Sequence, residues 1–454
     1  MIRASSSGGR RDSPRLAQRC HARLVNASQA RLSRGWLWSL VVAGVLVQTA
    51  LNLLRPITTY KLVAFGAGGT TIGLVTAAYA VLPIFIALSL GRLTDRTPRL
   101  RRLIMAAAAL MAVGGLSLAL APSIAALALG SVVLGLAHLV FTISGQAAIA
   151  RFSDDADLDL GFGWFTASYS VGQALGPLLG GAIVGVGAVT ASPERLADVD
   201  RALWVGAAIS LLAVPLLLAS PHRPPARPEP ADGAGTASSP STAPAASLPT
   251  AAQASSPSEP GSRATIPQVL RSPGVASNML ASMGLLAMVD ILSAFLPLVG
   301  EDAGVPPIVV GALLAIRGAA GILSRALLPW LSRRWSRRRL LITCLLVASI
   351  TLAVPPLVLD QLVVAGTLLA VGGFFLGIGQ PLTMTLIATA VPTQWRSQAL
   401  AVRLMGNRVG QVGFPLLAGL AVAPFGPGGA IWMAAIVLAI AGAEKALRTP
   451  PPQT

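Results

Sequence analysis

The stretch GQALGPLLGG at residues 172–181 returns as GQVGFPLLAG at residues 410–419, an offset of 238 residues. The same offset holds, without a gap, from the first long apolar span of the chain to the fifth. The matching pairs include Gly73 and Gly311, Leu93 and Leu331, Arg96 and Arg334, Arg99 and Arg337, Arg101 and Arg339, and Gly135 and Gly373. A match of this length indicates a duplicated six-helix unit, and duplicated membrane proteins usually bind their ligand between the copies.

The composition is that of a protein embedded in a lipid bilayer. The chain is 54% hydrophobic and 11% charged, whereas soluble domains have about 25% charged residues. The net charge of +17 does not indicate nucleic-acid binding, because the basic residues lie in short loops between apolar spans. Cys20 and Cys344 form neither a disulfide framework nor a zinc-binding spacing. We therefore predict no metal and no cofactor.

Twelve apolar stretches are long enough to cross a bilayer, which takes about 20 residues of helix. Six lie at 36–54, 70–90, 103–121, 123–150, 161–187 and 202–219, and six at 275–298, 307–331, 340–359, 362–391, 404–425 and 428–447. The predicted domains are a basic tail (1–35), a first bundle (36–219), a linker (220–274), a second bundle (275–447) and a short tail (448–454). We expect the basic tail to be disordered and the Pro/Ala/Ser-rich linker to be flexible.

The distribution of basic residues predicts the orientation of the chain. With the N-terminus inside, the inside segments hold 26 of the 34 Lys and Arg residues, and the outside loops hold Lys61, Arg195 and Arg201. Cytoplasmic loops are enriched in Lys and Arg. We expect a multi-pass protein of the cell membrane with both termini in the cytoplasm.

Two motifs resemble those of a known family. GRLTDRTPRLRR at residues 91–102 resembles motif A of the major facilitator superfamily, with Pro98 in place of the usual Gly. GQALGPLLGG at residues 172–181 is similar to motif C of that family, which is associated with export by proton antiport. The resemblance covers about residues 36–447. It implies an all-α membrane protein with twelve transmembrane helices in two pseudo-symmetric six-helix bundles, the major facilitator fold.

Motif A is expected to act as a gating latch. The resemblance implies that Gly91 lets a neighbouring helix approach and that Asp95 holds the second span against the eleventh, where Arg403 is the candidate partner. Arg96 and Arg99 belong to the same motif. The alternative is a charged loop that only sets the topology.

Motif C is expected to bend and pack the fifth span. Gly172, Gly176 and Gly180 are spaced by four and share one helix face, where small residues let two helix backbones touch. Pro177, next to them, removes a backbone donor and bends the helix. The motif ends at Gly181, and the resemblance places the bend at the interface between the halves. Generic close packing is the alternative.

Charges inside the spans are functional candidates, because a charge at the bilayer centre costs about 2.5–3.5 kcal/mol on insertion scales. Asp290 is the only acid well inside a span, and Arg317 lies at a similar depth in the next one. We expect these two to meet, either as a proton-coupling pair, as a static ion pair or as substrate contacts. Arg55 is expected to extend toward the outer membrane surface or to meet an anion there.

His138 is the other group that titrates near neutral pH, and its alternative role is that of a hydrogen-bonded packing residue. It lies where the family's drug antiporters have an Arg, so motif B is degraded. Polar residues expected to face the substrate cavity, or else to tie helices together, are Gln48, Asn52, Gln146, Asn278 and Gln380.

The function expected from these features is secondary active transport. We predict alternating-access export of a small organic molecule, a drug or a metabolite, by a monomer that exchanges it for protons across the lipid bilayer. Two alternatives remain open: uptake of a small organic anion by symport or uniport, and a non-transporting sensor on the same fold. An enzyme is not expected, since the sequence has no zinc-protease pair, nucleophile elbow or phosphate-binding loop.

Overall fold

In the computed structural model, the described residues are 13–153, 158–187, 193–219, 266–392 and 395–447. These ranges are almost entirely helical and contain no β-strand. The first half, here called the N-half, comprises α1 (Ser13–Ala64), α2 (Gly69–Arg96), α3 (Leu100–Ala119), α4 (Ile124–Phe152), α5 (Leu158–Val184) and α6 (Pro193–Ala219).

The second half, the C-half, begins with the short helix α7 (Ile266–Arg271), which lies inside the predicted linker. The long helices follow as α8 (Val275–Asp302), α9 (Pro307–Arg334), α10 (Arg337–Ala353), α11 (Leu362–Thr389), α12 (Arg396–Phe425) and α13 (Gly429–Leu447). A 3-10 turn, η3 (Pro355–Leu357), ends α10 earlier than predicted, because Pro355 and Pro356 lack the backbone donors that a helix needs.

Eleven helices in the described part of the chain are long and apolar enough to cross a membrane. The remaining predicted span, the fifth (161–187), corresponds to α5, which does not meet this test because its Gly, Ser and Gln residues lower its mean hydropathy. Its 27 residues still span about 40 Å, more than the hydrocarbon thickness of about 30 Å. The expectation of a disordered basic tail is wrong for part of that segment, since α1 begins at Ser13.

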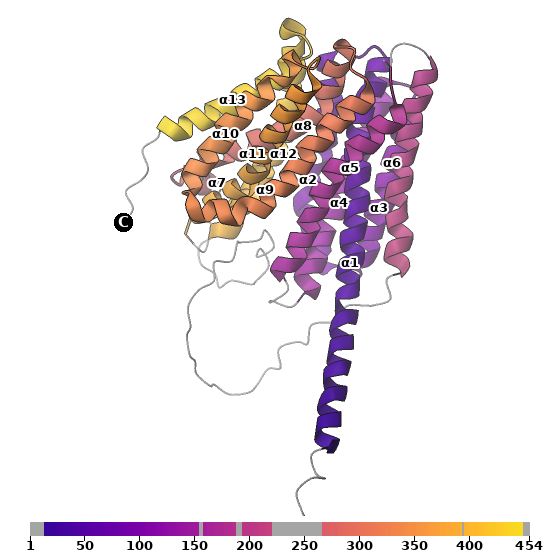
Figure 1. Ribbon diagram of the computed structural model, residues 1–454, viewed down its shortest axis with the longest axis vertical. Helices are drawn as coiled ribbons and strands as arrows, with labels where there is room; N and C mark the ends of the chain where they lie inside the picture. Colours follow the sequence, from indigo (N-terminus) through magenta and orange to yellow (C-terminus); the bar gives the residue numbers. More distant parts are fainter. Residues whose placement is uncertain (1–12, 154–157, 188–192, 220–265, 393–394, 448–454) are drawn as a thin grey trace, which may run out of the picture.

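The helices form two bundles that contact each other along three lines (Figure 1). In the N-half, α1 packs against α5 and α6, and α4 against α2 and α3. In the C-half, α11 packs against α9 and α10, and α8 against α12 and α13. Between the halves, α5 packs on α9, α2 packs on α12, and α1 meets α8. The two bundles lie close near the top of Figure 1 and diverge toward the bottom, where α1 extends.

Two equivalent close crossings join the halves at the end opposite the N-terminus. A Cβ added at Gly73 of α2 would lie 2.4 Å from the Pro415 carbonyl oxygen of α12. A Cβ at Gly311 of α9 would lie 2.3 Å from the Pro177 carbonyl oxygen of α5. The same 238-residue offset relates both members of these pairs, so one interface is built twice. The glycines four residues after the two prolines are Gly181 and Gly419. A Cβ added at either would also lie close to a backbone oxygen of the other half, at 2.5 Å and 2.7 Å.

The halves separate toward the other end along α2. A Cβ added at Gly91 would meet no described atom within 4 Å. Gly91 lies 18 residues beyond Gly73 on the same helix, a distance of about 27 Å. The expected close approach at Gly91 is therefore wrong for this conformation, because α2 and α12 touch at one end only.

Candidate functional site

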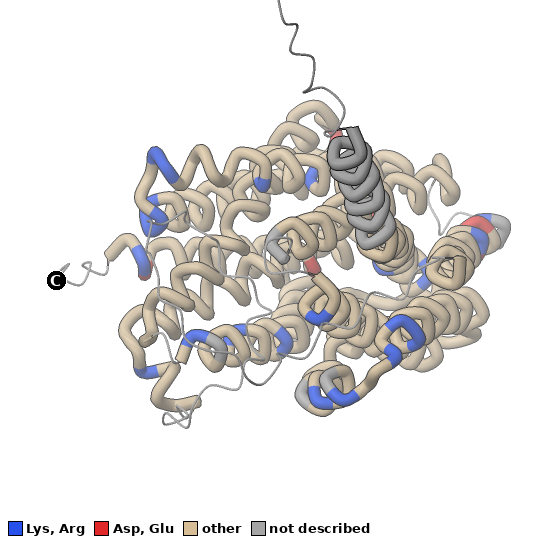
Figure 2. The backbone as a smooth tube through the Cα atoms, turned by 90° about the horizontal axis from the view of Figure 1, so that it is seen from below, with Lys and Arg blue, Asp and Glu red and all other residues tan. Residues whose placement is uncertain are grey.

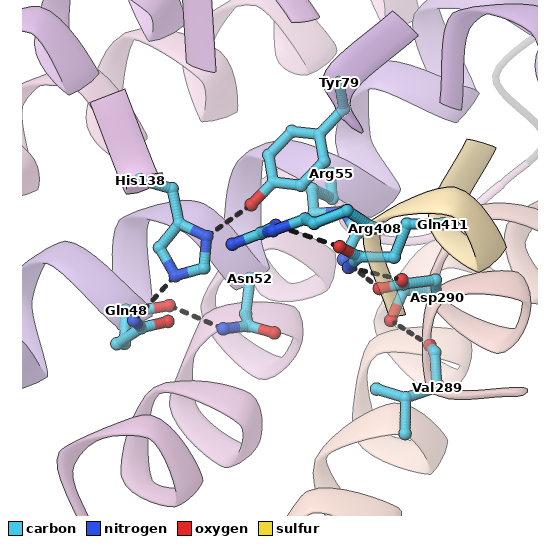
Figure 3. A network of polar contacts seen from close by, with 10 residues as sticks. Gln48, Asn52, Arg55, Tyr79, His138, Val289, Asp290, Arg408 and Gln411 are labelled. Atoms are coloured by element: carbon cyan, nitrogen blue, oxygen red, sulfur yellow. Dashed lines mark hydrogen bonds and ion pairs between the residues drawn. The ribbon is translucent and has the colours of Figure 1, made fainter. Parts of the chain in front are cut away.

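A polar network crosses the boundary between the halves (Figure 3). Asp290 lies about midway along α8 (Val275–Asp302). Its centre is the ion pair between Arg55 of α1 and Asp290 of α8, with 2.6 Å between Nη1 and Oδ1. The other carboxylate oxygen of Asp290 accepts a hydrogen bond from Gln411 of α12 at 2.9 Å. Among the described residues, this is the one ion pair that links the two halves. We call Arg55, Asp290 and Gln411 the central bridge.

The expected Asp290–Arg317 ion pair is wrong, and Arg55 takes the place of Arg317. Arg55 was expected to extend to the outer membrane surface, but α1 continues to Ala64, nine residues further. Arg55 therefore lies about 14 Å from the end of its helix, and its side chain is only 15% exposed. Its guanidinium also lies over the ring of Tyr79, 4.9 Å from the centroid, which favours a cation there.

Arg317 lies near the central bridge without bonding to it. Its residue exposure is 3%, and its Nε is buried with no hydrogen-bond partner among the described residues. It is close enough to Asp290 and Arg55 for an electrostatic interaction with both. Its stem runs along α11, where a Cβ added at Gly373 would lie 2.9 Å from its Cγ. Arg317 is thus a buried cation whose charge the central bridge does not neutralise by contact.

A chain of hydrogen bonds extends the network into the N-half. The Tyr79 hydroxyl lies 2.5 Å from His138 Nδ1, and the Gln48 amide nitrogen lies 3.1 Å from His138 Nε2. Asn52 donates to the backbone carbonyl of Gln48 at 2.8 Å. Both ring nitrogens of His138 are therefore engaged between α1 and α2. Through Tyr79, this chain reaches Arg55, so His138 and Asp290 belong to one continuous network (Figure 3).

Arg408 extends the network in the C-half, where it donates to Gln411 Oε1 at 2.9 Å. Sequence reasoning did not select Gln411 or Tyr79 as site residues. One signal was available, because Gln411 aligns with Gln173 and Tyr79 with Arg317 at the 238-residue offset. The close backbone approach that places Tyr79 is also duplicated, since Gly135 and Gly373 occupy equivalent positions against Tyr79 and Arg317.

Three of the residues expected to face a cavity instead make contacts that tie helices together. Asn278 accepts a 2.5 Å hydrogen bond from the buried ammonium group of Lys445, which joins α8 to α13. Gln380 accepts from Arg403 at 3.0 Å and donates to the Ser282 carbonyl at 3.4 Å. Of the two roles expected for Asn278 and Gln380, this conformation shows helix tying, because their polar atoms are used within the C-half. Gln48 is buried against His138, whereas Gln146 is half-buried on α4.

The motif A residues lie at the end where α2 and α12 are apart. Arg96 and Arg99 are exposed, and the side chain of Asp95 lies outside the described residues. Arg151 of α4 donates to the carbonyls of Thr94 and Thr97 at 3.0 and 2.7 Å and so satisfies the last turn of α2. The Asp95–Arg403 latch remains a prediction for a conformation in which this end closes.

The motif C glycines pack α5 onto α1. A Cβ at Gly172 would lie 2.4 Å from the Gln48 Cβ, and one at Gly176 would lie 2.6 Å from the Thr49 carbonyl oxygen. Gly180 likewise contacts Ile57, at 3.0 Å. Pro177 and Gly181 turn toward α9 instead. The motif therefore packs α5 against α1, which contains Gln48 and Arg55, and against α9 of the other half.

A small cavity of about 30 Å³ lies next to Arg55. Its lining includes Thr58, Thr59, Thr76 and Ser131 from the N-half and Ala294 from α8. A volume of this size holds about one water molecule, and the hydroxyl groups are suitable partners for it. The network is thus compact and largely filled in this conformation.

Comparisons with known proteins agree with this architecture. The sequence model of the Major Facilitator Superfamily matches residues 40–368 and 279–454. The chain belongs to the major facilitator superfamily. No curated protein matches the sequence significantly. The superfamily assignment makes this protein a multi-pass membrane transporter of small molecules rather than an enzyme.

Solved transporter structures share the fold at low sequence identity. A bacterial homologue of the human lysosomal transporter Spinster, inward-facing and unoccupied, has a TM-score of 0.64 at 16% identity and covers 92% of this chain and 94% of its own. The nucleoside transporter NupG has a TM-score of 0.64 at 15% identity, covering 92% of this chain and 100% of its own. These likenesses support the fold, and this superfamily member has its central bridge where the two bundles of that fold meet.

Proposed function

We propose that this protein exports a small organic molecule from the cytoplasm in exchange for protons, by alternating access. One observation supports this most directly: the Arg55–Asp290 ion pair joins the halves midway along the helices, below two crossings that close one end. Alternating access requires that one end close while the other opens, with the ligand held between the bundles. The ion pair lies where such a ligand would be reached from the open end.

Asp290 is the group proposed to couple protons to transport. Its carboxylate holds Arg55 and Gln411, and protonation would remove the charge that attracts Arg55. Loss of this attraction would weaken the contact between α1 and α8 and help the halves move. Motif C, which the resemblance links to proton antiport, supports the export direction.

The proposed orientation places both termini in the cytoplasm of a cell whose surface membrane holds the protein. Viewed from the end where α1 extends, Lys and Arg lie at helix ends of both halves (Figure 2). Many of them lie where α2 is followed by α3 and where α9 is followed by α10. These are Arg96, Arg99, Arg101, Arg102, Arg333, Arg334, Arg337, Arg338 and Arg339. Positive charge favours the cytoplasmic side, so the open end would face the cytoplasm.

Counterflow and proton-driven transport in proteoliposomes test this proposal. The wild-type protein should exchange at least one compound of a metabolite and drug panel, and a pH gradient should drive its accumulation. Asp290→Asn should retain counterflow but lose the response to the gradient, because the amide cannot bind and release a proton. Accumulation by the wild type that ignores the gradient would contradict proton coupling, and absence of any flux would favour the sensor alternative.

Uniport or symport uptake of an organic anion is the second candidate. It is favoured by the surplus of buried guanidinium groups, Arg55 and Arg317, over the single carboxylate of Asp290. In the same vesicles, uptake of an anion that is unaffected by a pH gradient would identify uniport. Uptake driven by an inward proton gradient would identify symport.

A further inference from the structure

We propose that the transported molecule contains a carboxylate or phosphate group, which binds the buried guanidinium group of Arg317, and that Asp290 competes with this group for the guanidinium groups of Arg55 and Arg317. The inference names the substrate class of the site described above and rests on the proposed transport function. It follows from an imbalance of charge within the network.

The centre of the molecule has more cations than anions. Arg55 pairs with the Asp290 carboxylate, and Arg408 is connected to it through Gln411. Arg317 is close enough to Asp290 for an electrostatic interaction. Asp290 is the one acidic side chain in this layer of the described structure. Placing an ion in a low-dielectric interior without a counter-charge is unfavourable. The site therefore favours an additional anion and disfavours a cationic ligand.

The partners of each guanidinium show where an anion would bind. Arg55 is satisfied by Asp290 at 2.6 Å. Within the described part of the chain, Arg408 donates to a neutral acceptor only, the Gln411 amide oxygen. Arg317 is 3% exposed, has no hydrogen bond to another described residue, and its Nε is fully buried without a partner. Since a planar guanidinium matches the two oxygens of a carboxylate or phosphate, Arg317 is the principal candidate for recognition.

Asp290 already occupies the place of a bound anion. One of its oxygens accepts from Arg55 and the other from Gln411, so both are engaged from opposite halves. Gln411 in turn bonds Arg408, which connects the two arginines through the carboxylate. An incoming oxyanion at Arg317 would compete with Asp290 for the attraction of Arg317 and Arg55. Removing the Asp290 charge should therefore strengthen anion binding.

Ligand-dependent thermal stability of the full-length protein in detergent tests the inference without requiring flux. Succinate, succinamide and 1,4-diaminobutane provide an anion, a neutral compound and a cation on one carbon skeleton. Glycerol 3-phosphate and glycerol form the matched phosphate pair. Chloride is tested separately at equal ionic strength. We expect concentration-dependent stabilisation by succinate, glycerol 3-phosphate or both, and none by the neutral or cationic partners.

Three variants assign the effect to residues. Arg317→Gln should weaken oxyanion binding by about tenfold or more, because it removes a charged hydrogen-bond donor. Arg317→Lys, which keeps the charge, should lose less. Arg325→Gln is the matched control on the same helix, since Arg325 already bonds the Ser170 hydroxyl and the Thr166 carbonyl of α5. Asp290→Asn should tighten binding of the same oxyanion.

Several outcomes would overturn the inference. These are stabilisation by the diamine or the neutral compounds, no stabilisation by any oxyanion, equal loss in Arg317→Gln and Arg325→Gln, or weaker anion binding in Asp290→Asn. Stabilisation by chloride alone would show a structural counter-ion only. If oxyanions bind as expected but cross no vesicle membrane, the proposed transport function fails, while the assignment of anion binding to Arg317 stands.

Discussion

At the scale of single residues, buried cations in this protein are satisfied by helix ends as well as by carboxylates. Lys61 was expected in an outside loop, yet it lies within α1 with an exposure of 2%. Its ammonium group donates to the carbonyls of Leu118 and Ala119, at 2.9 and 2.6 Å, and pairs with Asp200 at 2.8 Å. The C-terminal end of a helix has unpaired carbonyls and partial negative charge, which suits a cation.

Lys61→Met should therefore lower the melting temperature of the purified protein. The change leaves the carbonyls at the end of α3 and the Asp200 carboxylate without their cation, at a cost of about 1–3 kcal/mol. Arg201→Gln is the control. Arg201 forms an ion pair with Asp198, but the Arg201 side chain is 65% exposed, and exposed pairs contribute about 0–1 kcal/mol. Equal melting temperatures for the two variants, measured by fluorescence in detergent, would contradict this role.

At the scale of helices, glycines determine which pairs approach closely. A Cβ at Gly135 of α4 would lie 1.7 Å from the Tyr79 carbonyl oxygen of α2. In the C-half, Gly373 of α11 makes the equivalent approach to the Arg317 carbonyl at 2.4 Å. The first approach positions Tyr79 and the second positions Arg317, both at or next to the polar network. Helix packing and site geometry therefore depend on the same residues.

Gly135→Ala should destabilise the protein and displace Tyr79. A methyl group cannot fit at that distance without moving α2 from α4, and overpacking of this kind costs about 1–3 kcal/mol. Gly163→Ala on α5 is the control, because a Cβ there meets no described atom within 4 Å; it should be neutral or stabilising by about 0.5–1 kcal/mol. Thermal unfolding of both variants provides the measurement, and a stable Gly135→Ala protein would show that the helices separate easily.

At the scale of the whole molecule, the two duplicated crossings hold one end closed while α2 and α12 part at the other. Gly73 and Gly91 lie on the same helix. Gly73 lies inside a crossing, whereas a Cβ added at Gly91 would meet no described atom within 4 Å. A larger side chain at these two positions should consequently act on different conformations. A substitution that destabilises one of two conformations more than the other shifts the equilibrium between them.

Gly73→Val should shift the protein toward the conformation that is open at the crossings. A penalty of about 1–3 kcal/mol against the closed end corresponds to about a 5- to 150-fold change in the equilibrium. Spin labels at Leu74 and Leu420, which are both 58% exposed, would report this as a longer distance by double electron–electron resonance. Cys20 and Cys344 are replaced first, so that only the labelled positions react.

Gly91→Val is the matched control for that measurement. It should leave the Leu74–Leu420 distance unchanged, because this conformation has room for the side chain at the open end. If the predicted Asp95 latch forms when that end closes, Gly91→Val should also disfavour that alternative conformation. A longer label distance in Gly91→Val, or an unchanged distance in Gly73→Val, would contradict the two-ended arrangement.

The duplicated architecture and part of the site can be predicted from the amino-acid sequence alone. Apolar length, basic loops and the repeat of GQALGPLLGG predicted two six-helix halves, because a bilayer leaves few alternatives to helices that satisfy their own backbone. It also singled out Asp290 and His138 as ionisable groups inside spans. These inferences depend on local composition, which a linear pattern records.

Which side chains meet depends on how the helices pack, and the linear pattern does not specify it. Arg55 and Asp290 are 235 residues apart, and their contact depends on the rotation and depth of α1 and α8, which composition does not specify. Arg317, equally charged and at similar depth, has its stem along α11 and remains outside the pair. Partner choice followed from where the helices end and how closely glycines let them approach, so it emerged only when both bundles packed together.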